Sequence, residues 1–269
     1  MKLKKTILLF LLKLPEQFSE PGTLLFLLFF FMFPVTTSLN AQQVIRKSEI
    51  SFLSTDSLRI SANHYYSNKD NPYILLFHTE SSSRGEYDSI ASRFVKMNYN
   101  CLAVDLRSGD EFRYIENITA NRARDKGLSN DYAEAEKDVE AAIHYVNHIN
   151  DKKMVLLGSS YSATLCLKVA KNNPLIKSVM AFSPGEFFQP EFQLDEHLKD
   201  YDKPVFIAYS KSEAEYIEKL TVHLSDSLST FFNSNTESPY RGVRLLFPDN
   251  PANDEYWFSV LIFIKSLTP

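Results

Sequence analysis

The sequence predicts a doubly wound α/β fold in which most strands of the sheet are parallel. Short apolar runs, typical of strands buried on both faces, alternate along the chain with stretches of helical period. Strands separated by helices favour a parallel sheet with helices on both faces. No internal repeat or low-complexity linker interrupts this pattern after Ala41. The observations together indicate a single domain built on one sheet.

The expected elements follow one another in a simple order. Residues 50–54 and 58–66 look like a hairpin of edge strands, whereas residues 73–78 form a continuous apolar run that is typical of a buried parallel strand. Further strands are expected over residues 100–105, 153–157, 176–182, 204–209 and 243–247. Helices are expected over residues 88–97, 131–150, 160–172 and 257–264, and the second of these repeats apolar side chains at helical spacing.

The first 41 residues do not resemble part of this fold. Four lysines in residues 1–13 give a basic start, residues 24–33 are apolar, and small and polar residues follow up to Ala41. This order is typical of a secretory signal peptide. We therefore expect cleavage before Gln42, an exported (periplasmic or extracellular) protein, and one domain over residues 42–269. The alternative is an uncleaved membrane anchor, but a span needs about 20 apolar residues and a proline ends this run early.

Charge and cysteine content narrow the possible partners. Of 29 basic and 33 acidic residues, four lysines and two glutamates precede Gln42, which leaves the domain with 25 and 31 and a net charge of −6. No basic stripe is present, so nucleic acid is not an expected partner. Cys101 and Cys166 lie in apolar contexts and are expected to be unpaired core residues, with a disulfide as the alternative in an exported chain. No residue pattern suits zinc or calcium, so no metal or other cofactor is expected.

A short motif follows the apolar strand at residues 153–157. Gly158-Ser159-Ser160-Tyr161-Ser162 matches G-x-S-x-G except that serine replaces the last glycine. Between a strand and a helix this motif is a nucleophile elbow, a strained turn that lifts one serine hydroxyl above the sheet. The turn also leaves the N–H of the next residue free for an oxyanion. Ser160 is therefore the candidate nucleophile, and Tyr161 provides one oxyanion-hole amide.

Other segments carry a family resemblance. The loop at residues 78–87, Asp105-Leu-Arg-Ser-Gly109, the elbow and residues 182–186 occur in the order found in dienelactone-hydrolase-like members of the α/β-hydrolase superfamily. From about residue 50 to its end, the chain resembles that family. The resemblance implies an α/β-hydrolase fold, here without a large lid, and a small ester or lactone as substrate. It also implies that Thr79 supplies the second oxyanion-hole amide.

His78 and Glu213, two residues to which the resemblance gives a role, each have an alternative interpretation. His78 lies where the loop shapes the substrate-binding region, but the resemblance implies that it stabilises its own loop and transfers no proton. Glu213, after the strand at 204–209, lies where the family places the acid that orients a histidine. Glu215 is a substitute for it, and both glutamates also suit the first turn of a solvated helix.

The catalytic histidine is missing from the expected place. The chain order of this fold is nucleophile, acid, histidine, with the histidine in the loop after the last strand. With that strand at 243–247, the loop is 248–254, and no histidine follows His223. Losing the histidine of such a triad lowers turnover about a million-fold. His197 is the one histidine that could stand in, and Asn253→His or Asp254→His would restore the base if the loop is correctly placed.

Two classes of function therefore remain open. The first is an exported serine hydrolase of carboxylic esters or lactones, with Ser160 as nucleophile and weak activity. The second is a non-catalytic member of the same fold that binds a small ligand or a partner. Tyr161, Phe187, Phe188 and Phe192 are either pocket walls that suit an apolar acyl group or simply core. The membrane is a partner only if the N-terminal segment stays uncleaved.

Overall fold

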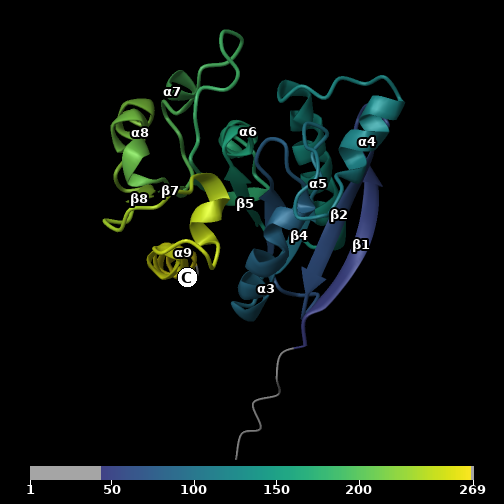
Figure 1. The fold of residues 1–269 in the computed structure, drawn as a ribbon, viewed down its shortest axis with the longest axis horizontal. Helices are drawn as coiled ribbons and strands as arrows, with labels where there is room; N and C mark the ends of the chain where they lie inside the picture. Colours follow the sequence, from purple (N-terminus) through teal and green to yellow (C-terminus); the bar gives the residue numbers. More distant parts are fainter. Residues whose placement is uncertain (1–43, 268–269) are drawn as a thin grey trace, which may run out of the picture. The chain divides into compact units, whose positions relative to one another are not determined.

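The computed structural model describes residues 44–267, and within them the chain forms one eight-stranded sheet (Figure 1). The strand order is β1-β2-β4-β3-β5-β6-β7-β8. β1 and β2 form an antiparallel hairpin, β2 pairs antiparallel with β4, and the remaining pairs are parallel. The strands are β1 (Arg46–Leu53), β2 (Arg59–Tyr66), β3 (Tyr73–Phe77), β4 (Asn100–Val104), β5 (Met154–Ser159), β6 (Ile176–Phe182), β7 (Val205–Ala208) and β8 (Ser229–Phe232).

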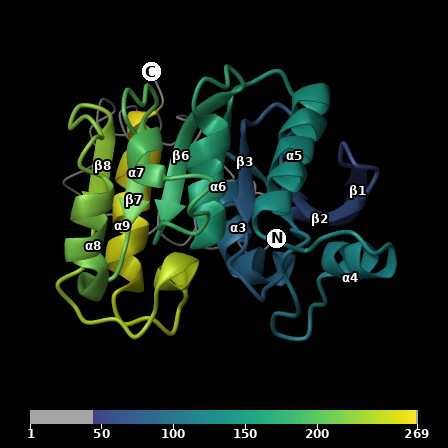
Figure 2. The same cartoon turned by 90° about the horizontal axis from the view of Figure 1, so that it is seen from above.

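Helices cover both faces of this sheet, as Figure 2 shows from above. Strand residues alternate between two apolar cores, one packed against α3 and α9 and the other against α5 and α6. The helices are α3 (Asp88–Lys96), α4 (Ile118–Asp125), α5 (Glu136–Ile149), α6 (Tyr161–Ala170), α7 (Leu194–His197), α8 (Ala214–Leu220) and α9 (Asn253–Ser266). Short 3-10 helices are η2 (Arg84–Tyr87), η3 (Ala133–Ala135), η4 (Lys211–Glu213) and η5 (Gly242–Leu246). The doubly wound, mostly parallel α/β fold is confirmed.

One expected strand is wrong. Residues 243–247 are not extended but belong mostly to η5, and the last strand is β8, which the sequence did not reveal. An apolar run of five residues fits a buried turn as well as a strand, because its periodicity is too short to separate them. β8 is an edge strand of four residues that is only partly buried, so its apolar signal is weak. The loop after the last strand is therefore residues 233–241.

Several smaller expectations can be compared with the described residues. Cys101 and Cys166 are both buried and unpaired, as expected. Residues 1–41 lie outside the part of the chain that the structure describes, so the signal peptide stays a prediction. From residue 44 to residue 267, no helix has the length and apolar character needed to cross a bilayer.

A buried ion network holds the loop that follows β4. The Arg107 guanidinium is fully buried and contacts Asp138 of α5, whose side chain is also fully buried, at 2.8 Å. The same carboxylate accepts the Arg107 backbone N–H at 2.8 Å. On its other side, Arg107 pairs with the partly exposed Asp56 at 2.6 Å. The loop is therefore fastened to α5 and to the β1–β2 hairpin by one side chain.

We expect Asp138→Ala to destabilise the fold by about 3–5 kcal/mol, because it removes the fully buried carboxylate that partners the buried Arg107 charge. Asp56→Ala is the matched control, since the Asp56 carboxylate is partly exposed and its loss should cost less. Urea unfolding at pH 7 measures both free energies. An equal loss in the two variants would contradict this account of the network.

Candidate functional site

The elbow is formed at the carboxyl end of β5. Ser160 follows that strand with φ of 60° and ψ of −126°, and α6 begins at the next residue. The Ser160 N–H donates to the Phe182 carbonyl at 2.8 Å, which ties the turn to β6. A Cβ on Gly158 would lie 2.4 Å from the Ser162 carbonyl oxygen, so only glycine fits where helix and strand approach. The structure therefore gives Ser160 the strained strand–turn–helix setting expected from the motif.

Ser162, which replaces the last glycine of the motif, is built into the turn. Its hydroxyl donates to the Phe77 carbonyl at 2.7 Å and accepts the Ser159 N–H at 2.9 Å. A buried hydroxyl with both kinds of partner costs little to bury. The substitution therefore adds a link between β3 and the elbow and leaves the turn intact.

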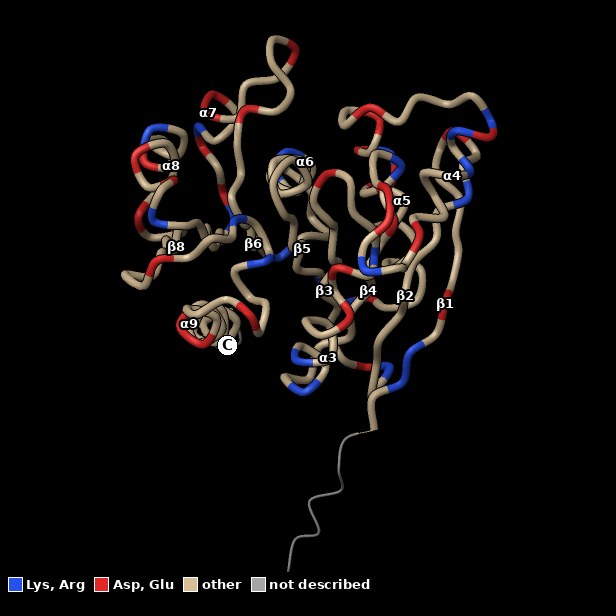
Figure 3. Tube along the Cα trace, viewed as in Figure 1, with Lys and Arg blue, Asp and Glu red and all other residues tan. Residues whose placement is uncertain are grey.

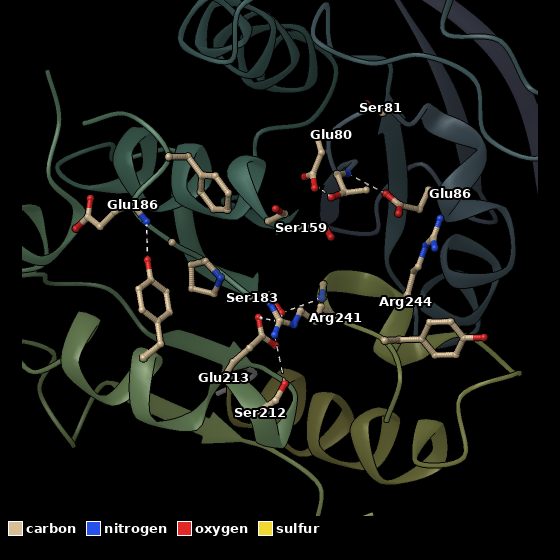
Figure 4. A pocket seen from close by; sticks show the side chains of 18 of the residues that line it. Glu80, Ser81, Glu86, Ser159, Ser183, Glu186, Ser212, Glu213, Arg241 and Arg244 are labelled. Atoms are coloured by element: carbon tan, nitrogen blue, oxygen red, sulfur yellow. Dashed lines mark hydrogen bonds and ion pairs between the residues drawn. The ribbon is translucent and has the colours of Figure 1, made fainter. Parts of the chain in front are cut away.

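A polar cavity of about 810 Å³ opens beside Ser160 (Figure 4). Four glutamates and two arginines contribute to its wall, and no histidine is among the described residues that line it. Within residues 44–267, the Ser160 hydroxyl has no hydrogen-bond partner. The lining residues are Thr79, Glu80, Ser81, Glu86, Ser159, Ser160, Ser183, Pro184, Gly185, Glu186, Phe187, Ser212, Glu213, Tyr216, Pro239, Tyr240, Arg241, Gly242 and Arg244.

The Glu213 carboxylate is already occupied by protein groups. One of its oxygens accepts the Ser210 N–H at 2.8 Å, the Ser210 hydroxyl at 2.7 Å and the Ser183 hydroxyl at 3.1 Å. The other oxygen lies 4.0 Å from Nε of Arg241, and Figure 4 shows the two side chains facing each other across the cavity floor. An arginine thus faces the carboxylate that would orient a histidine. Glu215, the substitute acid, pairs instead with Lys219 in α8 and does not line the cavity.

Two backbone contacts fix Arg241 in this place. The Val243 N–H donates to the Ser159 hydroxyl at 2.9 Å, and the Gly242 N–H donates to the Ser183 hydroxyl at 2.8 Å. Gly242 has a φ of +59°, and a Cβ there would lie 2.4 Å from Ser159 Oγ. The start of η5 therefore packs directly against the elbow. Because Gly242 is held there, the loop that follows β8 ends at Arg241.

The expected position of the missing histidine needs correction. The loop after the last strand is 233–241 and contains no histidine. Asn253 and Asp254 open α9 and do not line the cavity, so a histidine there would not replace the base. His197 does not stand in either, because its ring packs on Phe192 beside the far end of α6 and is absent from the cavity wall.

The loop at residues 78–87 differs from the expected oxyanion hole. The Thr79 N–H, expected to be free, donates to the buried Glu86 carboxylate at 2.9 Å. The amides of Tyr161 and Glu80 make no hydrogen bond within the described residues. Of the two expected oxyanion-hole amides, therefore, only that of Tyr161 is unoccupied.

His78 supports the loop and does not touch the cavity. Nδ1 donates to the Thr79 carbonyl at 2.7 Å, and Nε2 accepts the Leu106 N–H at 2.9 Å. Burial lowers the pKa of His78 to about 4, which keeps the ring neutral. Its assignment to substrate binding is therefore corrected to a structural role, the alternative that the resemblance implied.

The expected aromatic wall is only partly present. Phe187 lines the cavity and is 39% exposed, but Phe188 packs into the core with Phe192. The Tyr161 ring is buried, stacked on Tyr132 at 4.3 Å and hydrogen-bonded to Ser108. The cavity is consequently more polar and more charged than an apolar acyl group requires.

Comparisons with known proteins agree with this geometry. Residues 60–230 match the family model described as the dienelactone hydrolase family. The structure resembles an esterase of Pyrococcus furiosus, with 16% identity, 82% of this chain and 93% of that chain covered, and a TM-score of 0.60. It also resembles a dienelactone hydrolase of Anabaena variabilis, with 16% identity, 82% and 96% covered, and a TM-score of 0.58. No curated protein sequence gives a significant match.

At these identities the structural likeness supports the α/β-hydrolase fold, while the family match covers well over half of the chain. The matched range ends at residue 230, inside β8. The loop that carries Arg241 therefore lies beyond the part that follows the family pattern.

Glu86 gives a prediction about pH and stability. Burial raises its pKa to about 7 from a usual value near 4.5, although the Thr79 N–H and Arg244 favour the charged form. The folded protein thus holds a proton that the unfolded chain releases, and stability falls as pH rises from 4.5 through 7. Glu86→Gln removes this loss, so we expect it to exceed the wild type by up to about 3 kcal/mol at pH 8 and to match it at pH 4.5.

Urea unfolding across this pH range measures the difference. Glu191→Gln is the control, because it removes an exposed carboxylate that is not among the groups acting on Glu86 and should not change the pH dependence. A Glu86→Gln protein no more stable than the wild type at pH 8 would show that the charged carboxylate costs nothing in its place.

Proposed function

Because the chain belongs to the dienelactone hydrolase family, we propose that it binds a small carboxylic ester or lactone over Ser160 and turns it over only slowly. The observation that carries the proposal is the position of Arg241 opposite Glu213. A serine hydroxyl is a weak nucleophile until a neighbouring base takes its proton. A guanidinium keeps its own proton throughout the accessible pH range and cannot be that base.

The other parts of a serine hydrolase support binding of such a substrate. The Ser160 hydroxyl follows a strained turn, borders the cavity and has no hydrogen-bond partner within residues 44–267. The free amide of Tyr161, at the start of α6, suits a carbonyl oxygen. Arg241 and Arg244 add positive charge to the wall, which suits the electron-rich oxygens of an ester. The site is thus equipped to hold an ester, and no histidine among the described residues lines it to activate the serine.

A second candidate function is binding without any turnover. It is favoured by the hydrogen bond from the Thr79 N–H to Glu86, which withdraws one of the two amides expected to stabilise an oxyanion. The two candidates share the ligand class and differ only in whether Ser160 forms a bond to it.

We also propose that the protein is exported. The basic start, the short apolar run at residues 24–33 and the small residues up to Ala41 support cleavage and release outside the cytoplasm. An uncleaved segment that anchors the domain to a membrane is the alternative. Either form would place the site outside the cytoplasm.

We expect Arg241→His to raise p-nitrophenyl acetate hydrolysis about 10²–10⁴-fold over the wild type, because an imidazole there could be oriented by Glu213 and serve as general base. Arg241→Gln is the matched control, since it removes the same guanidinium and supplies no base. The gain should vanish when Ser160→Ala is added. Brisk turnover by the unmodified protein that disappears with Ser160→Ala would contradict the proposal.

Export gives a separate expected result. Mass spectrometry of the protein recovered from outside the cytoplasm should give a mature N-terminus near Gln42. A chain with Met1 intact that is retained in the membrane fraction would instead establish the anchor.

A further inference from the structure

A second cavity, of about 860 Å³, lies at the edge of the sheet opposite Ser160. Its wall includes the residues at which three neighbouring parallel strands begin. Lys153 immediately precedes β5, Lys177 is the second residue of β6, and Lys203 stands two residues before β7. The candidate site at Ser160 lies at the carboxyl ends of the same strands, so the two cavities are separated by the length of the sheet.

Four lysines line this cavity: Lys152, Lys153, Lys177 and Lys203. The Lys152 ammonium donates to the Asp70 carbonyl. Within residues 44–267 the other three ammonium groups make no hydrogen bond or ion pair, and Asp202 is the one acidic residue in the wall. Figure 3, in which lysine and arginine are blue and aspartate and glutamate red, shows both signs of charge spread over the chain. This edge is basic although the domain as a whole carries an excess of acidic residues.

The position of these lysines is not explained by helix capping. Lysines commonly lie in the last turn of a helix, where they offset its negative end. Lys153, Lys177 and Lys203 lie at strand starts instead, and adjacent strands are only about 4.8 Å apart. Lys177 is also the one exposed residue of an otherwise buried strand. Like charges that start from adjacent strands repel one another, so a bound anion would stabilise the arrangement.

We propose that this cavity binds the phosphate group of an anionic ligand, supplied either by a free phosphorylated molecule or by a phospholipid headgroup. The lysine ammonium is a compact point charge that binds phosphate well. Tyr99, Leu267 and Pro204 give the cavity an apolar side that can cover the rest of the ligand. The proposal does not depend on what Ser160 does.

The topology makes the headgroup a natural source. β1 is antiparallel to β2, which is antiparallel to β4, so β1 runs in the direction of the parallel strands. Arg46, where β1 begins, therefore lies at the same edge as the lysine cavity. The apolar run at residues 24–33 precedes it by a short stretch. An uncleaved N-terminal segment, the alternative to cleavage, would tether the chain to a bilayer, whose anionic headgroups attract nearby lysines by about 1 kcal/mol each.

The experiment compares the full-length wild type with Lys153→Gln/Lys177→Gln, at about 50 mM NaCl because salt screens exposed charges. Lys126→Gln/Lys211→Gln is the matched control, since it removes the same charge from exposed positions away from the cavity. One arm measures binding of inorganic pyrophosphate by calorimetry. The other measures cosedimentation with phosphatidylcholine vesicles with and without phosphatidylglycerol, so that the pure phosphatidylcholine sample reports binding through the apolar segment.

We expect the cavity variant to bind about 25-fold more weakly than the wild type, which is about 5-fold for each lysine, and the control to bind as the wild type does. Loss in the pyrophosphate arm identifies a free phosphorylated ligand, and loss confined to phosphatidylglycerol vesicles identifies a headgroup. Equal affinities for the two double variants, or no binding by the wild type in either arm, would overturn the proposal.

Discussion

The first turn of α6 approaches the end of β5 so closely that Gly158 has no room for a side chain. This approach forces Ser160 into a positive φ and turns its hydroxyl toward the cavity. It also presents the Ser159 hydroxyl to the Val243 N–H and leaves Gly242 in contact with it. The last loop of the domain can therefore end only against the elbow, and Arg241 lies at Glu213 as a result.

The close approach of α6 to β5 shapes the cavity for binding but does not supply a base for catalysis. A strained serine, an unoccupied amide and a polar cavity are present although no histidine among the described residues lines the cavity, because none of them depends on the residue at 241. Glu213 keeps its place since Ser210 and Ser183 supply three hydrogen bonds to it. An acid that is stabilised by these hydrogen bonds does not need a histidine to hold it in place. The site can thus retain its shape while losing the step that requires a base.

Much of the fold and part of the site could be predicted from the sequence. Buried strands such as β3, β5 and β6 have continuous apolar runs, and the elbow has a motif whose small residues are a steric need. β8 was not predicted, because an edge strand of four residues that is only partly buried has no distinct apolar pattern in the sequence. Residues 243–247 have the apolar run expected of a buried strand because η5 buries Val243, Leu245 and Leu246.

Because a turn was expected to be a strand, the loop for the histidine was expected at residues 248–254, whereas the loop after the last strand is 233–241. The side chain that faces Glu213 could not be found from the sequence, because Arg241 has no motif and its position depends on hydrogen bonds to Ser159 and Ser183. The same holds for Thr79, whose amide is occupied by Glu86 only because η2 folds back on the loop.

The central claim is that Ser160 is positioned but not activated, and covalent labelling tests it most directly. A fluorophosphonate reacts with a serine whose proton a base removes, and intact mass spectrometry follows the adduct over time, with Ser160→Ala as the blank. The account predicts that only a small fraction of the wild type is labelled in the minutes over which an activated serine reacts to completion. Stoichiometric labelling of Ser160 within minutes would contradict it and would mean that another group in the cavity serves as the base.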